Sequence, residues 1–290
     1  MSRVRTALPR HSGRLRRALG GTVALLVTLL AATVLAMPGT ATAATAATGR
    51  GHVSHPQLDW LGSTIRAHEG SSAAAPHQVV SPMVAQTPGM DVSGYQGNVN
   101  WSAAWSNGGK FAYVKATEST SYTNPYFAQQ YNGSYNVGMI RGAYHFATPD
   151  TSSGATQADY FVNHGGGWSD DGKTLPPMLD IEYNPYGATC YGLSQGAMSQ
   201  WIADFSNRVN ARTGRYPTIY TTTDWWSQCT GNNPNFGANP LFIARYSSSP
   251  GTLPASWGYQ TIWQYADSGV FPGDQDYFNG AYDRLQAFSH

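Results

Sequence analysis

The run Leu175-Pro176-Pro177-Met178-Leu179-Asp180-Ile181-Glu182 is apolar until it reaches two carboxylates. A short apolar run that follows two prolines predicts a buried strand, over residues 177–182. Side chains two apart on a strand point to the same face, so Asp180 and Glu182 are expected side by side. Like charges in a partly desolvated site oppose each other's ionisation, which keeps one carboxyl protonated near neutral pH. Alone, the tripeptide Asp180-Ile181-Glu182 is weak evidence for a catalytic site, because such a pattern more commonly marks a solvated strand end.

Seven further β-rich runs lie before and after this one. Together, the predicted strands cover residues 89–92, 111–117, 139–146, 177–182, 218–222, 241–246, 261–265 and 274–278. The predicted helices cover residues 101–107, 124–136, 154–164 and 194–212. No helix is predicted after Thr222, where the connections contain Asn, Pro, Gly and Ser. Alternating strands and helices indicate parallel βα units. The fold class is therefore α/β, a modified, irregular (β/α) barrel of eight strands with helices mainly in the first half.

Polar residues at the strand ends mark the candidate site, because such barrels build their active sites at the carboxyl ends of the strands. Asp91 belongs to the first strand, and Asp274 and Asp276 to the last. The first, fourth and last strands approach one another when the ring closes. The candidate catalytic residues are Glu182, Asp180, Asp91 and Asp274, and Asp276 is a less certain member.

Aromatic residues at strand ends indicate the kind of ligand. Phe, Trp and Tyr make up 13% of the chain. The apolar faces of sugar rings pack on aromatic planes, and Tyr and Trp also offer a hydrogen-bonding edge. Any one of these residues is as readily explained as core. As a set, the predicted substrate-binding residues are Tyr144, Tyr220, Trp263, Gln264 and Tyr265.

The N-terminal third divides into two parts. Residues 1–43 have six arginines and no acid before an apolar run over residues 18–37, which is typical of a signal peptide. A membrane anchor is the alternative, because the run approaches the roughly 20 residues that span a bilayer. Residues 44–87 are rich in Ala, Ser, Pro and His and are interpreted as a propeptide or linker. One short helix is expected there, formed by Leu58, Trp60, Leu61 and Ile65. The remaining residues, 88–290, form the predicted catalytic barrel, which is expected to be secreted into the extracellular space.

Charge and cysteine content exclude several classes of protein. From residue 88 onward, nine Lys and Arg stand against 14 Asp and Glu, a formal charge near −5. This composition does not favour nucleic acid as a partner. The two cysteines, Cys190 and Cys229, predict a disulfide in an exported chain, with two free thiols as the alternative. No His-Glu-x-x-His or Cys-x-x-Cys set is present, so no metal or cofactor is expected.

Five segments together resemble family 25 glycoside hydrolases, the Chalaropsis-type lysozymes. They are MDVSGYQG (90–97), FAYVKATE (111–118), RGAYHF (141–146), LDIE (179–182) and GDQDYFNG (273–280). The resemblance spans residues 89–290. It implies cleavage of the β-1,4 bond between N-acetylmuramic acid and N-acetylglucosamine, by a monomer whose partner is the glycan of bacterial peptidoglycan, without a membrane after signal cleavage. It also implies that Glu182 is the general acid and Asp180 its partner, with Asp91 and Asp274 shaping the electrostatics.

Reaction stereochemistry stays open at this point. Cα atoms two apart on a strand lie about 6.6 to 6.8 Å apart, whereas carboxyl separations of roughly 5 to 5.5 Å indicate retention and about 6.5 to 9.5 Å inversion. Our hypothesis is substrate assistance, in which the 2-acetamido oxygen attacks the anomeric carbon. Two alternatives are a non-catalytic peptidoglycan-binding barrel and a chitinase-like N-acetylglucosaminidase. The chitinase pattern Asp-x-x-Asp-x-Asp-x-Glu is absent before Glu182.

Overall fold

The computed structural model describes residues 55, 58–70 and 85–290. The signal peptide predicted over residues 1–43 lies outside the described residues, as does most of the propeptide or linker predicted over residues 44–87. Among the residues described, no helix is both long and apolar enough to cross a membrane.

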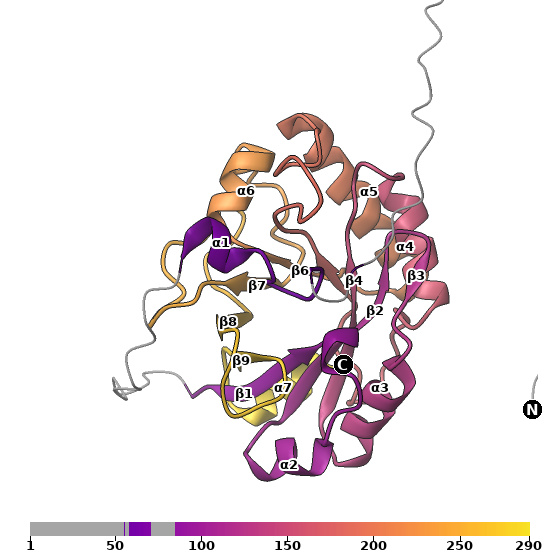
Figure 1. Cartoon of the computed structure of the whole chain (residues 1–290), viewed down its shortest axis with the longest axis vertical. Helices are drawn as coiled ribbons and strands as arrows, with labels where there is room; N and C mark the ends of the chain where they lie inside the picture. The colour runs from indigo at the N-terminus through magenta and orange to yellow at the C-terminus, as the bar shows by residue number, and fades with distance from the viewer. Residues whose placement is uncertain (1–54, 56–57, 71–84) are drawn as a thin grey trace, which may run out of the picture. The chain divides into compact units, whose positions relative to one another are not determined.

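Eight strands close into a barrel, in the ring order β1-β9-β8-β7-β6-β5-β4-β2, and a parallel pairing of β1 with β2 completes it (Figure 1). A ninth, two-residue strand, β3 (Tyr122–Thr123), pairs with the end of β2. All eight predicted strands are present, and the α/β barrel is confirmed. Two strands end two residues earlier than predicted: the strand predicted over residues 177–182 ends at Asp180, before Glu182, and the strand predicted over residues 241–246 ends at Ala244. The barrel strands are β1 (Thr87–Val92), β2 (Phe111–Glu118), β4 (Ile140–Phe146), β5 (Met178–Asp180), β6 (Thr218–Thr221), β7 (Leu241–Ala244), β8 (Ile262–Ala266) and β9 (Asp274–Phe278).

Strand β9 runs antiparallel to both of its neighbours, whereas the other seven barrel strands are mutually parallel. The connection over residues 267–273 explains the difference, since a parallel return requires a crossover of a dozen or more residues. This loop closes on Gly273, whose φ of 75° is a conformation that side chains disfavour. The antiparallel register places Asp274 directly opposite Asp91.

The four predicted helices are confirmed as α2 (Trp101–Ser106), α3 (Phe127–Asn136), α4 (Gly154–Asn163) and α5 (Gln195–Thr213). The side chain of Ser194 caps α5 by accepting a hydrogen bond from the amide of Ala197. Helix α3 begins three residues later than predicted, because Asn124 precedes a proline and disfavours helical geometry. A short helix does form in the segment before the barrel, as α1 (Ile65–Glu69), but of the four residues predicted to form it only Ile65 belongs to it; Leu58, Trp60 and Leu61 lie in turns and bends before it.

The prediction of no helix after Thr222 is wrong. Two short helices follow, α6 (Thr223–Thr230) and α7 (Tyr282–Phe288). The Thr222 side chain caps α6 by accepting a hydrogen bond from the amide of Trp225, and α6 buries Trp226 and Cys229. The capping threonine and the apolar residues spaced three and four apart were the available signals.

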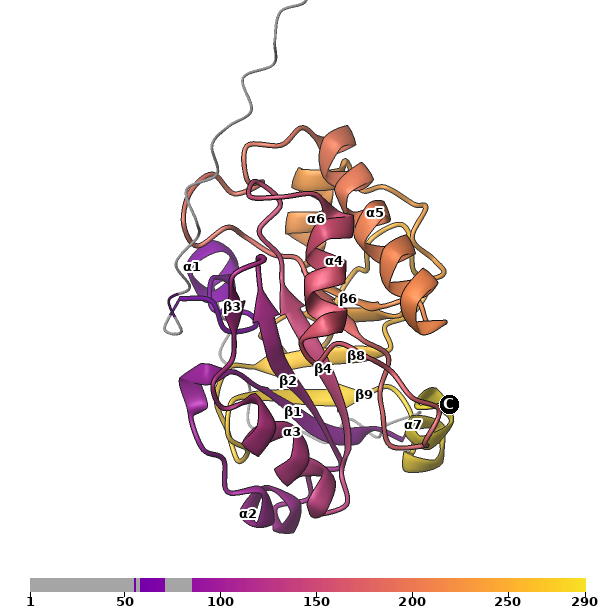
Figure 2. The same ribbon diagram turned by 90° about the vertical axis from the view of Figure 1, so that its right-hand side faces the viewer.

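Apolar residues form layers inside and outside the barrel. Inside, Phe111, Tyr113, Met178 and Phe242 belong to one buried cluster. Outside, α4, α5 and α6 pack against β4, β5 and β6, while α2 and α3 cover β1 and β2 (Figure 2). Loop residues such as Trp257 cover the outer face of β7 and β8. The predicted disulfide between Cys190 and Cys229 is confirmed, and it joins the loop after Glu182 to α6.

Candidate active site

Glu182 and Asp180 lie at the carboxyl end of β5, where strand alternation decides their direction. Leu179 and Ile181 point outward into the helix layer, and the side chains two apart from each other face the barrel interior. Both carboxyls are buried, each at 1% exposure. Burial raises the pKa of Glu182 to about 7, although hydrogen bonds from Gly62 and Thr64 act in the opposite direction. Burial and then the charge of Glu182 raise the pKa of Asp180 well above its ordinary value.

The side chain of Gln264 connects the other two predicted carboxylates. Its Nε2 donates to Asp91 Oδ2 at 2.9 Å and to Asp274 Oδ2 at 2.7 Å. Its Oε1 accepts a hydrogen bond from the hydroxyl of Tyr220 at 2.7 Å. Because Gln264 and Tyr220 are both fully buried, they position the carboxylates within the barrel. The structure thus brings Asp91, Asp274, Gln264 and Tyr220 into one network.

Asp91 and its neighbours hold protons to unusually high pH. Burial raises the pKa of Asp91 to about 8, the charge of Glu182 adds to the rise, and the Gln264 hydrogen bond opposes it. Burial and the charge of Asp91 raise the pKa values of Asp274 and Asp276 well above the ordinary range. Asp276 is therefore a buried member of the same group. Within the described part of the chain, no group of three or more metal-binding side chains has the arrangement of a metal site.

The predicted aromatic set separates into two faces of the barrel wall. Tyr144 is buried in the interior cluster, and its hydroxyl accepts a hydrogen bond from the amide of Leu61. Trp263 and Tyr265 flank Gln264 on β8, so alternation turns them to the outer face, where they pack with Tyr277. The structure does not bring Trp263 and Tyr265 to the carboxylates.

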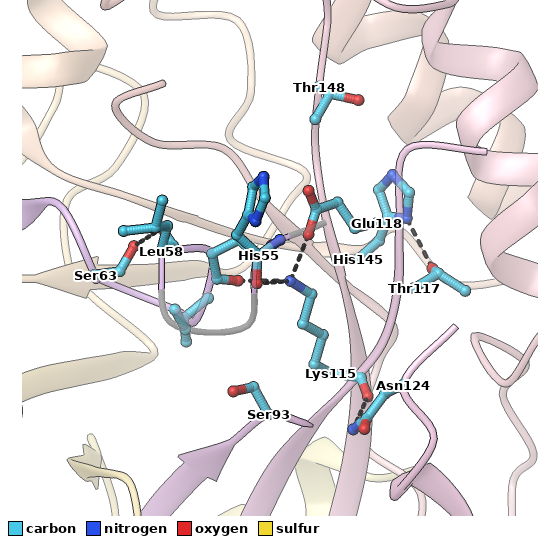
Figure 3. Close-up of polar contacts among 12 residues, drawn as sticks. His55, Leu58, Ser63, Ser93, Lys115, Thr117, Glu118, Asn124, His145 and Thr148 are labelled. Atoms are coloured by element: carbon cyan, nitrogen blue, oxygen red, sulfur yellow. Dashed lines mark hydrogen bonds and ion pairs between the residues drawn. The ribbon is translucent and has the colours of Figure 1, made fainter. Parts of the chain in front are cut away.

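A buried ion pair beside the carboxylates was not among the predicted site residues. Lys115 Nζ contacts Glu118 Oε2 at 2.7 Å, and both side chains are at most 1% exposed (Figure 3). Residues three apart on a regular strand face opposite sides, but β2 has a bulge between Lys115 and Thr117 that turns Glu118 inward. A bulge has no clear signature in one sequence, which explains why strand alternation missed this pair.

His145 lies behind the barrel wall. Its Nδ1 hydrogen-bonds the Thr117 hydroxyl at 2.8 Å (Figure 3), and its Nε2 hydrogen-bonds Gln157 at 3.0 Å. It also packs against Phe161 and Phe205 of the helix layer. Burial lowers the pKa of His145 to about 3, so the ring is neutral. The structure gives His145 a packing role and leaves acid chemistry to the carboxyls.

Taken together, the barrel mouth holds Glu182, a carboxyl whose pKa is raised to about 7, next to the buried carboxyl of Asp180 and a hydrogen-bonded network of further acids. This arrangement can donate a proton to an ether-type oxygen and stabilise positive charge that develops beside it. It is the chemistry of a glycoside hydrolase.

Comparisons with known proteins agree with that class. Residues 90–274 match the glycosyl hydrolases family 25, and the chain belongs to that family. The N,O-diacetylmuramidase of Chalaropsis sp is 52% identical, over 68% of this chain and 96% of its own length. Lysozyme M1 of Streptomyces globisporus is 43% identical, over 98% of this chain and 99% of its own length. The solved lysozyme of Streptomyces coelicolor is 48% identical with a TM-score of 0.68, over 70% of this chain and 96% of that chain.

Proposed function

We propose that this protein is a lysozyme, a 1,4-β-N-acetylmuramidase that cleaves peptidoglycan between N-acetylmuramic acid and N-acetylglucosamine, with Glu182 as its general acid. The observation that carries the proposal is the position of Glu182, beside Asp180 at the mouth of a family 25 barrel; with residues 58–70 over it, burial raises the pKa of this carboxyl to about 7. A general acid works best when its pKa lies near the operating pH.

The proposed reaction divides the roles among the carboxyls. Glu182 gives its proton to the glycosidic oxygen as the bond to the anomeric carbon breaks. The 2-acetamido oxygen of the substrate forms a new bond to that carbon, and Asp180 stabilises the oxazolinium ion. A water molecule then gives a proton to the Glu182 carboxylate and bonds to the anomeric carbon, while the bond from that carbon to the acetamido oxygen breaks, which leaves the anomeric configuration retained and Glu182 protonated again. Proton NMR of the first product anomer tests this route, and an inverted product would refute it.

Asp91, Asp274 and Gln264 act in this proposal as positioning groups. Gln264 holds Asp91 and Asp274 with one amide group, and the charge of Asp91 bears on Asp180. Tyr144 and Tyr220 provide the proposed substrate-binding surface of the mouth. We further propose that the barrel is secreted as a monomer and acts on cell walls outside the cell.

The test of the general acid is Glu182→Gln. Because Gly62 and Thr64, which precede the barrel, contact Glu182, the variant and the unchanged enzyme both receive an inserted protease site between Ala85 and Gln86, which are exposed, so that the chain can be cut there. After cutting, the variant should solubilise cell walls about 10² to 10⁴ times more slowly than the unchanged enzyme. Asp204→Asn on the outer helix α5 is the matched control and should keep full activity. Lysis by Glu182→Gln at the original rate would exclude Glu182 as the acid.

A barrel that only binds glycan is the alternative, and the muramidase and lysozyme relatives do not favour it. It needs the mouth and its tyrosines, but it does not need a proton on Glu182. Undiminished binding of cell walls by the cut chain, without any new reducing ends, would favour this candidate over the hydrolase.

A further inference from the structure

Residues 58–70 lie in the mouth of the barrel, although they come from the segment before it (α1, Figure 1). Leu61 and Ile65 are 0% and 1% exposed, and they join the interior cluster that contains Tyr144 and Tyr220. The segment therefore buries its apolar side chains at the carboxyl ends of the strands, where a substrate of the proposed enzyme must enter.

Both oxygens of Glu182 are bound by this segment. The amide of Gly62 donates to Oε1 at 2.6 Å, and the hydroxyl of Thr64 donates to Oε2 at 2.8 Å. With Gly62 and Thr64 in contact with both oxygens, no glycosidic oxygen can come within hydrogen-bonding distance of this carboxyl. The contact thus occupies the proposed acid itself.

The backbone of residues 61 and 62 fits the mouth closely. Gln264 Nε2 donates to the carbonyl of Leu61 at 3.3 Å, and the hydroxyl of Tyr246 donates to the carbonyl of Gly62 at 3.1 Å. Gly62 has a φ of 83°, and an added Cβ would lie 2.4 Å from the Tyr246 hydroxyl and 2.6 Å from that of Tyr220. Only glycine fits this position, because a side chain would meet both strain and collision.

A buried charge anchors the start of the segment. Lys115 Nζ donates to Asp59 Oδ1 at 2.9 Å and to the Asp59 carbonyl at 2.6 Å. Asp59 Oδ2 also accepts a hydrogen bond from the Tyr186 hydroxyl at 2.7 Å. Because Lys115 keeps its ion pair with Glu118, departure of Asp59 leaves no unpaired buried charge in the barrel. Asp59 can therefore leave without stranding the Lys115 ammonium.

Contacts at the rim extend the coverage. The ring of His68 stacks on Tyr183 with centroids 4.1 Å apart, and Tyr183 donates to Glu69 Oε1 at 2.7 Å. Arg66 pairs with Asp267 on the loop between β8 and β9. The segment therefore contacts the rim of the mouth at Tyr183, after β5, and at Asp267, between β8 and β9.

We propose that residues 58–70 are an autoinhibitory pro-segment, which blocks the barrel until the chain between this segment and β1 is cut. The inference rests on the proposed function, because it assigns the blocked site to catalysis. A tethered segment binds at a high effective concentration, and cutting the tether lets it leave on dilution. Cutting thus converts an inactive secreted precursor into the active enzyme.

The experiment uses the chain with the protease site between Ala85 and Gln86, compared before and after cutting and dilution. Reducing ends released from cell walls should rise about tenfold or more on cutting. Gly62→Ala should raise the activity of the uncut chain toward that of the cut chain. Gly70→Ala is the matched control, because Gly70 also has a positive φ, of 70°, but open space around it, and it should leave the uncut chain inactive.

Two outcomes separate failure of this inference from failure of the proposed function. If the uncut chain is as active as the cut chain, the autoinhibitory role is refuted and the muramidase stands. If the cut chain is as inactive as Glu182→Gln, the proposed function fails.

Hydrogen exchange gives a readout that does not depend on activity. The backbone amides of residues 61 and 62 should be protected in the uncut chain and should lose protection in Gly62→Ala. Unprotected amides in the uncut chain would overturn the inference.

Discussion

Replacing Asp91 by Asn should make the protein lose less stability as the pH rises. Asp91 is buried, and burial raises its pKa to about 8 from an ordinary value of 3.8. Between these two values the folded state keeps a proton that the unfolded state has released. Since the folded state binds more protons in that window, its stability falls as the pH rises through it, and the group adds no further slope above pH about 8. Asn mimics the protonated carboxyl and can still accept the hydrogen bond from Gln264.

The magnitude follows from proton linkage. Each pH unit over which the folded state retains one extra proton costs about 1.4 kcal/mol of unfolding free energy. From pH 5 to pH 7, Asp91 therefore costs ~2–3 kcal/mol, with the lower value applying if Asp274 and Asp276 share the proton. Between pH 5 and pH 7, the free energy of unfolding of Asp91→Asn should therefore not show this decrease.

Urea unfolding followed by tryptophan fluorescence at pH 5, 6 and 7 measures this difference. Asp159→Asn is the control, because Arg208 lowers the pKa of Asp159 and leaves it ionised in both states over this range. It should keep the slope of the unchanged protein. If Asp91→Asn shows the same pH slope as the unchanged protein, the claim that Asp91 is held neutral in the barrel is refuted.

Three further predictions concern the ion pair, the disulfide and the mouth. Lys115→Met should lower the free energy of unfolding in urea by about 3–5 kcal/mol, because it leaves buried carboxylates without their cation. Lys110→Met is the control, because Lys110 is partly exposed and its ammonium lies over the Trp105 ring; an equal loss in both variants would contradict the reasoning. Serine at Cys190 and Cys229 together should lower the free energy of unfolding by about 4 kcal/mol on the chain-entropy model, and an unchanged melting temperature would exclude this contribution. Tyr144→Phe should lower kcat/KM of the cut chain about tenfold on cell walls without changing the urea midpoint, whereas an unchanged kcat/KM would remove its hydroxyl from the substrate surface.

Strand alternation explains how much of the candidate site could be predicted from the sequence. The inward positions of Asp180 and Glu182 follow from their spacing alone. The same rule applied to β8 separates Gln264 from Trp263, but the sequence prediction grouped all strand-end aromatics by position and not by face. The ion pair of Lys115 with Glu118 was not predicted, because the bulge in β2 interrupts the alternation of side chains. Such local departures depend on contacts that a single strand pattern does not contain.

The segment before the barrel shows a second limit of local reasoning. Its composition indicates a propeptide or linker, and its apolar residues predicted one helix near the observed α1. The docking of Gly62 onto Glu182 joins residues 120 apart in sequence. Neither residue has a neighbour in the sequence that indicates the other, so only the folded barrel reveals the contact.

The sugar at the reducing end of the fragments released from peptidoglycan by the cut chain tests the central claim most directly. Fragments are reduced with borohydride, hydrolysed and separated. We expect N-acetylmuramic acid at the new reducing ends, so that its alditol is recovered, and we expect none above background from Glu182→Gln. Recovery of the N-acetylglucosamine alditol in its place would contradict the assignment as a muramidase.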